Sequence, residues 1–220
     1  MAITVDSTGS TKSSVASTVI AFSHTCQGNN RLLVVGVQQG TTIGSAIQAT
    51  YAGTSMTQQA VMGVGVHVAA IFTLLAPTTG TNTVSITVSS GRFNTYSAES
   101  VSFTSVNQTT PIRSTQSTFA ASSIATVEVS GLSAGDMVID SALFTSASAM
   151  TTGAGQTLIF ASTITNADFN IAGGMSIETA TASTITMSWS QVSAGSTYLI
   201  TAVALIEAVA AAQSQLIWMQ

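Results

Sequence analysis

Residues 84–88, VSITV, alternate strictly between apolar and hydroxyl-bearing side chains. Successive side chains of a β-strand point to opposite faces of its sheet, so this period predicts a strand with one buried and one wet face. The same alternation returns at residues 185–189, ITMSW. Residues 31–38, RLLVVGVQ, are almost continuously apolar instead, which predicts a strand that is buried on both faces.

Short segments of these two kinds fill the chain up to about residue 205, separated by clusters of Gly, Asn and Ser. Such spacing is typical of strands joined by turns. Signals for helices are almost absent; only the Ala-rich stretch within residues 207–220 could form a short helix. We therefore predict an all-β protein built from antiparallel sheets. Further strands are predicted at residues 15–22, 46–51, 56–62, 67–75 and 96–103.

The second half of the chain repeats the order of the first. Residues 136–142, DMVIDSA, match residues 31–37, RLLVVGV, and the Ala-Gly pair at 52–53 returns at 154–155. Four blocks keep the same order at a spacing of about 100 residues, as expected of an internal duplication. The remaining matches pair Val84, Ile86 and Val88 with Ile185, Met187 and Trp189, and Tyr96, Val101 and Phe103 with Tyr198, Val203 and Leu205.

Two arrangements fit this repeat: each half forms a small sandwich of its own, or the halves interleave in one sandwich around a pseudo-twofold axis. Each half supplies only about five or six short strands, which is marginal for an independent core. We therefore favour a single β-sandwich of the jelly-roll type over residues 1–206. Its halves span about residues 1–105 and 112–206, and residues 207–220 form a C-terminal tail.

The composition limits the function. Charged residues make up 5% of the chain, against roughly 25% in an ordinary soluble domain. Four Lys and Arg residues cannot form the basic patch that binds nucleic acid. No apolar run approaches the roughly 18 residues of a membrane-spanning helix. Because exposed charges normally protect β-proteins from sticking, their scarcity suggests a surface covered by other copies or other proteins. The alternative is an extracellular β-protein with a coat of Thr and Ser side chains.

The sequence offers no convincing catalytic or metal-binding motif, and we predict neither an enzyme nor a cofactor. His24 and Cys26 lack a second pair of ligands, and they are expected to be a turn-adjacent histidine and a small buried thiol. Asp136 and Asp140 share one face of a strand, but we expect a turn residue and a hydrogen-bonded polar group rather than a glycosidase pair. Glu99 lies on an apolar face, where a structural hydrogen bond is expected.

The C-terminal tail ends in an apolar tip formed by Leu216, Ile217, Trp218 and Met219. Exposed on a monomer, such a tip would be a sticky patch. It either folds back on its own sandwich or reaches into a neighbouring subunit, and it is our candidate interface. Residues 1–10, which lack the features of a signal peptide, are the second candidate.

Several stretches resemble a loosely defined group of β-sandwich proteins of phage virions and of prophage-borne or bacterial surface proteins. They are NNRLLVVGV at residues 29–37, YAGTSMT at 51–57, PTTGTNTVSITVSSG at 77–91, VSFTSVNQTTPI at 101–112 and TITMSWS at 184–190. The resemblance covers most of the chain up to about Glu207. It implies a structural role in capsid decoration, in a tail or fibre, or in adhesion.

Together these observations favour a capsid decoration (cement) protein on the surface of a phage virion. It would be a homo-oligomer, with a trimer favoured, bound to the major capsid protein or to other virion proteins. The alternative is a carbohydrate-binding or adhesion module of a tail fibre or a cell surface. That function requires exposed aromatic rings that stack on sugars, for which Tyr51, Phe93 and Tyr96 are the candidates.

Overall fold

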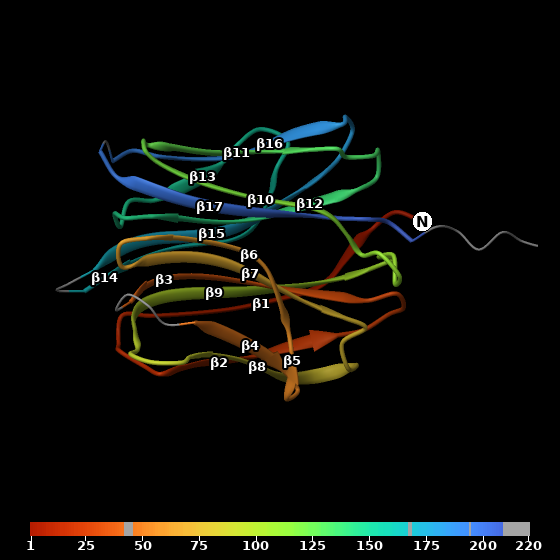
Figure 1. The fold of residues 1–220 in the computed structure, drawn as a ribbon, viewed down its shortest axis with the longest axis horizontal. Coiled ribbons are helices and arrows are strands. Elements are labelled where there is room, and N and C mark those ends of the chain that lie inside the picture. Colours follow the sequence, from red (N-terminus) through yellow and green to blue (C-terminus); the bar gives the residue numbers. More distant parts are fainter. Residues whose placement is uncertain (42–45, 167–168, 194, 209–220) are drawn as a thin grey trace, which may run out of the picture.

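The computed structural model of the protein describes residues 1–41, 46–166, 169–193 and 195–208 (Figure 1). Throughout these ranges the regular structure consists of β-strands. The part of the chain that is described contains no helix long and apolar enough to cross a membrane. The prediction of an all-β protein with antiparallel sheets is confirmed.

The first half of the chain forms two antiparallel sheets. The inner sheet, which faces the other half, has the strand order β1-β9-β3-β7-β6, and the outer sheet has the order β2-β8-β4-β5. The strands are β1 (Thr4–Ser13), β2 (Val19–Cys26), β3 (Leu32–Thr41), β4 (Ile47–Tyr51), β5 (Thr54–Ser55), β6 (Thr57–Val64), β7 (His67–Leu75), β8 (Gly80–Val88) and β9 (Phe93–Thr104).

The second half also forms an inner and an outer sheet. Its inner sheet has the order β10-β17-β12-β15-β14, and its outer sheet has the order β11-β16-β13. The two inner sheets have the same strand order when β1, β9, β3, β7 and β6 are matched with β10, β17, β12, β15 and β14. The strands are β10 (Ile112–Ala121), β11 (Ile124–Ser130), β12 (Met137–Phe144), β13 (Met150–Thr152), β14 (Thr157–Thr165), β15 (Asn170–Thr179), β16 (Thr184–Gln191) and β17 (Thr197–Leu205).

The four sheets are stacked as layers, with the two inner sheets packed face to face in the middle (Figure 1). Strand β3 lies against β12, and β9 lies against β15. At the two sides of the stack, the edge strand β10 lies over β6 and the edge strand β14 lies over β1. The molecule therefore has a β6/β10 side and a β1/β14 side, each made of two stacked sheet edges.

The halves do not interleave, which corrects our preference for a single shared sandwich. Every ladder joins two strands of the same half. Each half supplies more and longer strands than the sequence suggested, and these are enough for two layers. The isolated bridge between Val106 and Glu207 is a pairing that joins the segments flanking the two halves.

Burial on both faces of the inner sheets explains the long apolar runs. All eight residues of β12 are buried, and β9 is buried over most of its length. Three apolar layers result, one inside each half and one between the halves. Their largest members are Tyr51, Phe72 and Phe93 in the first half, Phe144 and Trp189 in the second half, and Ile71, Phe103, Ile139 and Met175 between them.

Glycines allow the inner sheets to approach each other closely. A Cβ atom on Gly36 would lie 2.6 Å from Met175 Cε, and one on Gly173 would lie 2.4 Å from Ser97 Oγ. Real Cβ atoms do not come so close to other heavy atoms, so a larger residue at either position would require its neighbours to move. At Gly36 the terminal methyl group of Met175 could rotate away, whereas at Gly173 the side chains of both Ser97 and Gln38 would have to shift.

Each of the four edge strands of the inner sheets is interrupted by a bulge. The extra residues are Asp6 in β1, Gln59 in β6, Arg113 in β10 and Ile159 in β14. A bulge bends an edge strand and breaks its row of free backbone groups, which hinders pairing with another chain. The inner sheets therefore have a protection of their edges that does not depend on charge.

Candidate functional site

The side chains that could take part in catalysis or metal binding are dispersed rather than gathered in a cleft. Within the described residues, no group of three or more His, Cys, Asp and Glu side chains is placed to hold a metal ion.

His24 and Cys26 are both buried, inside the first half. His24 Nδ1 lies 2.7 Å from Ser100 Oγ, while its Nε2 has no hydrogen-bond partner among the described residues. Burial lowers the pKa of His24 to about 4, although the nearby Asp6 acts in the opposite direction. Burial also raises the pKa of the Cys26 thiol. A neutral imidazole and a protonated thiol are consistent with the packing roles that were predicted.

Asp136 and Asp140 belong to separate structures and do not form a catalytic pair. Asp136 lies in the turn before β12, where it forms an ion pair with Arg113 and accepts a hydrogen bond of 2.8 Å from Ser133 N. Asp140 lies on β12 and points into the core of the second half, where it contacts Trp189 and Ser176.

Asp140 is fully buried, and four donors surround it, the most distant being Gln156 Nε2 at 3.4 Å from Oδ2. Ser176 N and Ser176 Oγ each donate to Oδ1 at 2.9 Å, and Trp189 Nε1 donates to Oδ2 at 2.8 Å. Gln156 extends the network, since its Nε2 donates to Ser176 Oγ and its Oε1 accepts from Ser188 N. Burial raises the pKa of Asp140 to about 7, while these donors act to lower it. The network holds Trp189 in place, and both Asp140 and Trp189 are buried.

Glu99 lies in the middle layer, between the halves, and is fully buried. We expected it to make a structural hydrogen bond, but neither of its oxygens has a partner among the described residues. Burial raises the pKa of Glu99 to about 8, while the neighbouring side chains of Gln38 and Ser97 act to lower it. Glu99 is therefore largely a neutral carboxylic acid at pH 7, which is how a carboxyl group without partners persists in a core.

Gln38 carries the polar connection between the halves that the sequence analysis missed. Its Nε2 donates to Ser141 Oγ at 2.6 Å in the other half, and its Oε1 accepts from Ser97 Oγ at 2.6 Å. Position 38 follows the apolar run of residues 31–37, and its parity placed it on a buried face. That parity was the signal, but it could not identify a partner more than a hundred residues away.

The aromatic candidates for sugar stacking are all buried, which corrects that expectation. Tyr51 and Phe93 are completely enclosed, and Tyr96 is nearly so. Tyr51 donates instead to the backbone oxygen of Gly80 at 2.9 Å. Their apolar faces complete the core of the first half.

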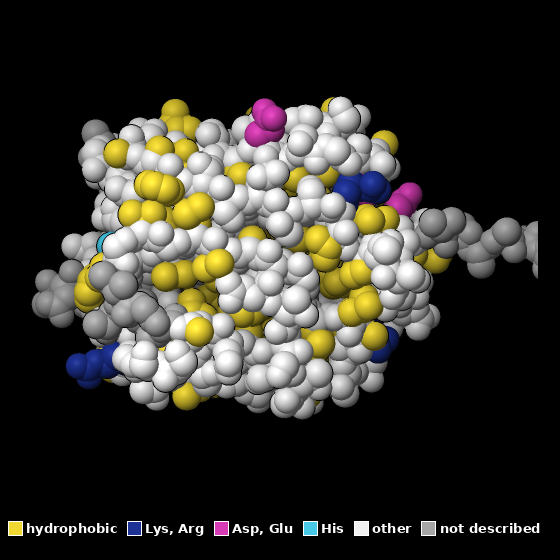
Figure 2. Space-filling view, viewed as in Figure 1, with side chains coloured by type: hydrophobic (Ala, Val, Ile, Leu, Met, Phe, Trp, Pro, Cys, Tyr) yellow, Lys and Arg dark blue, Asp and Glu magenta, His cyan; other side chains and the backbone are white. Residues whose placement is uncertain are grey.

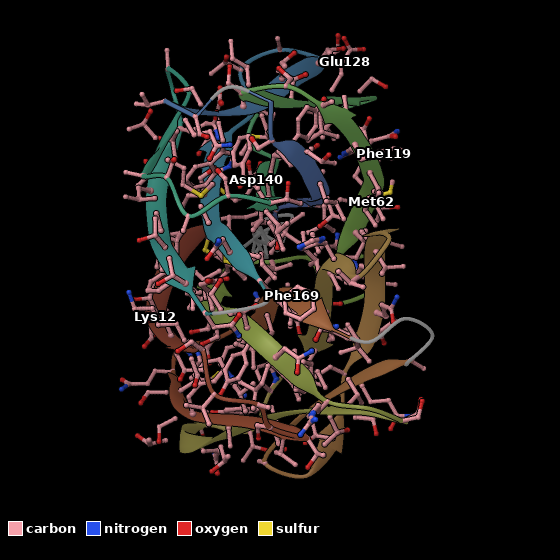
Figure 3. The ribbon with its side chains drawn as sticks, turned by 90° about the vertical axis from the view of Figure 1, so that its left-hand side faces the viewer. Lys12, Met62, Phe119, Glu128, Asp140 and Phe169 are labelled. Carbon is pink, nitrogen blue, oxygen red and sulfur yellow. The ribbon has the colours of Figure 1, made fainter. Side chains whose placement is uncertain are left out.

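An exposed aromatic residue instead lies on the β6/β10 side. Phe119 of β10 is 53% exposed, and Val61 of β6 is 47% exposed. Phe119 and Met62 both project along this side (Figure 3). Figure 2 shows the same side face on, with hydrophobic side chains spread across it and charged side chains only towards its outline. This side is therefore an apolar surface almost without charges.

The two terminal segments that were predicted as interfaces differ in what can be said of them. Residues 4–13 form the edge strand β1, and the amino group of Met1 donates to Ala208 O at 3.2 Å and lies 3.7 Å from Glu207 Oε2. The N-terminal segment is therefore bound to its own fold. The apolar tip of Leu216, Ile217, Trp218 and Met219 lies outside the described residues.

Comparison with known proteins adds no relative, since no family model, no curated protein and no solved structure matches the chain.

Proposed function

We propose that the protein is a structural component of a phage virion, a capsid decoration (cement) protein that acts by packing against its neighbours rather than by catalysis. The observation that carries this proposal is the apolar β6/β10 side with its exposed Phe119. In a chain with 5% charged residues, such a surface is suited to being covered. Contacts of this kind resist changes of salt concentration, which weaken ion pairs.

We infer further that each half is a jelly roll and that the halves arose by duplication. In the first half the pairs are nested, with β1 on β9, β2 on β8, β3 on β7 and β4 on β5. This is the pairing of a long hairpin rolled into two sheets. The second half repeats it with β10 on β17, β11 on β16 and β12 on β15. Bulges at matching edge strands, Asp6 with Arg113 and Gln59 with Ile159, support a common origin.

The occupant that we assign to the β6/β10 side is a second copy of this chain, in a homo-oligomer for which we favour a trimer. The only charged residue in β6 and β10 is Arg113, and it is already paired with Asp136. Two copies can therefore approach through this side without like-charge repulsion. The outer layers and the C-terminal tail then remain for contact with the major capsid protein or other virion proteins.

The experiment is the molar mass of the purified chain by light scattering. We expect an oligomer, and we expect Phe119→Lys to shift it towards the monomer, because a charge would be buried at the contact. The matched control is Leu158→Lys, because Leu158 is 52% exposed on the opposite side of the molecule. A second variant that lacks residues 213–220 tests the tip. A monomeric wild type, or equal effects of both lysine substitutions, would overturn the assignment of this side.

A further inference from the structure

The β1/β14 side carries a trough that the proposed structural function does not use. Two adjoining cavities of about 320 and 300 Å³ share Lys12 and Thr163 in their linings. Met150 and Ser162 line the first cavity, and Thr165 lines the second. Lys12 projects on this side, opposite Phe119 and Met62 (Figure 3). The trough therefore combines one cation, several hydroxyl groups and an apolar floor.

The charge of Lys12 is not compensated within the described structure. The ion pairs found there involve Met1 with Glu207 and Arg113 with Asp136, and none involves Lys12. Among the residues that the structure describes, no acidic one lines either cavity. Lys12 is exposed, and an ammonium group without a counter-charge beside hydroxyl-bearing side chains attracts an anion.

Ser162 provides a second, independent observation. It is 7% exposed, and its hydroxyl oxygen has no hydrogen-bond partner in the described part of the chain. A buried polar group without a partner is uncommon and costs about 1–3 kcal/mol. Since this oxygen is itself covered, a ligand would reach it only after a side chain of the trough has rotated, a motion of picoseconds to nanoseconds at exposed positions.

The polar side chains of the β1/β14 side are not required by the fold, because the matching positions on the β6/β10 side are apolar. Lys12 pairs with Ser97 at the edge of one inner sheet, and Phe119 pairs with Leu199 at the edge of the other. Ser162 pairs with Gly173, and Met62 pairs with Ala69. At corresponding places, one side of the molecule thus has Lys12 and Ser162, and the other has Phe119 and Met62.

We propose that this trough binds a carboxylate-bearing saccharide. The ammonium group of Lys12 pairs with the carboxylate, which is a charge-assisted hydrogen bond. Hydroxyl groups of Ser162, Thr163 and Thr165 exchange hydrogen bonds with sugar hydroxyls, and the exposed Ala149 contacts the apolar face of a sugar ring. A single cation is too few for a nucleic-acid backbone, whose binding rests on many phosphate contacts. The trough therefore fits an acidic glycan.

The test uses the full chain and tetragalacturonate as the probe, with neutral galactotetraose for comparison, by titration calorimetry and amide chemical shifts. We expect binding of the acidic probe only, with shifts at residues 12–14 and 162–165. Lys12→Gln keeps a donor but removes the charge, and it should weaken binding about tenfold or more, the effect of losing one charge-assisted hydrogen bond.

Val192→Ser is the control and should bind as the wild type does, because Val192 is 94% exposed and lines neither cavity. Equal binding of both probes, an unchanged affinity of Lys12→Gln, or no binding of tetragalacturonate at millimolar concentration would overturn the proposal. Because the readout is ligand binding, the outcome is independent of the oligomeric state that tests the proposed function.

Discussion

The inner sheets of the two halves share one strand order, but the two halves place different side chains at the centre of their cores. In the first half Val35 on β3 pairs with Phe72 on β7, and both are apolar. When residues 31–37 are aligned with residues 136–142, Val35 corresponds to Asp140, which pairs with Ser176. The same position thus holds an apolar contact in one half and a hydrogen-bonded carboxyl group in the other. The architecture therefore depends on filling the space and satisfying its polar groups, rather than on one particular chemistry.

The largest loss of stability should follow from placing a carboxyl group in the core of the first half, which has no matching donors for it. In Val35→Asp the new carboxyl group would lie among Tyr51, Phe72 and other apolar side chains, without the donors that surround Asp140. We expect a loss of about 4 kcal/mol or more in the free energy of unfolding, measured by denaturant titration. Val35→Ala is the control, and it should cost about 2 kcal/mol through its cavity alone. Equal losses for both variants would contradict this account.

A smaller loss of stability is expected from removing the carboxyl group of Asp140 in the second half. Asp140→Ala leaves Trp189 Nε1 buried without an acceptor and should lower the free energy of unfolding by about 3 kcal/mol. Asp140→Asn keeps an acceptor oxygen and should lose less. Denaturant titration at pH 6 compares the variants. If the alanine variant lost less than about 0.5 kcal/mol, the network around Asp140 would not stabilise the fold.

A pH-dependent effect should come from the buried acids. Burial raises the pKa of Glu99 to about 8 and that of Asp140 to about 7, so the folded state holds protons that the unfolded chain has already released. Stability is then highest near pH 4–5 and falls as the pH rises through these values. In Glu99→Gln the part of this loss due to Glu99 disappears.

We expect the midpoint temperature of Glu99→Gln to rise relative to the wild type by about 2–4 °C between pH 5 and pH 6, the shift that about 1 kcal/mol causes in a chain of this size. Scanning calorimetry at both pH values measures it. Thr201→Val, at the matching place in the second half, should show no such dependence. A constant difference between Glu99→Gln and the wild type would mean that Glu99 is ionised when folded.

The smallest effect concerns the β1/β14 side. Ser162→Ala removes a hydroxyl group without a partner, so the free energy of unfolding should stay within about 0.5 kcal/mol of the wild type or rise slightly. Met62→Ala, at the corresponding place on the other side, removes apolar packing and should cost more. A loss above 1 kcal/mol for the serine variant would show that its hydroxyl group is hydrogen-bonded in solution.

The sequence contained most of the information on the strands and much less on their assembly. Alternation at residues 84–88 and the apolar run at 31–38 identified strands because side-chain parity is a local property. The division into two stacked pairs of sheets depends on which strands pair, and register between distant segments leaves no local signal. For the same reason Gln38 and Ser141, which meet across the middle layer, could not be matched from the sequence.

The candidate sites followed the same rule. The burial of Cys26 and the turn position of Asp136 were predicted, because both depend on neighbouring residues, whereas the burial of His24 within β2 was not. The exposure of Phe119 and the trough at Lys12 were missed, because each arises where two strands from different halves are stacked. The bulges that protect the sheet edges, such as those at Asp6 and Arg113, were also missed, because a bulge depends on how distant strands pair. These bulges substitute for the exposed charges that the composition lacks.

The face-to-face packing of the inner sheets has a consequence for biosynthesis. The face formed by Leu32, Val34, Ile71, Val101 and Phe103 packs against side chains of the second half, among them Ile139, Met175 and Val203. Ribosomes add about 5–20 residues per second, so the first half must wait roughly 5–20 s before its cover has been made. During that interval the nascent chain presents a whole sheet of apolar side chains to the cytosol. The yield of protein in a cell should therefore depend on chaperones that bind a newly emerged first half.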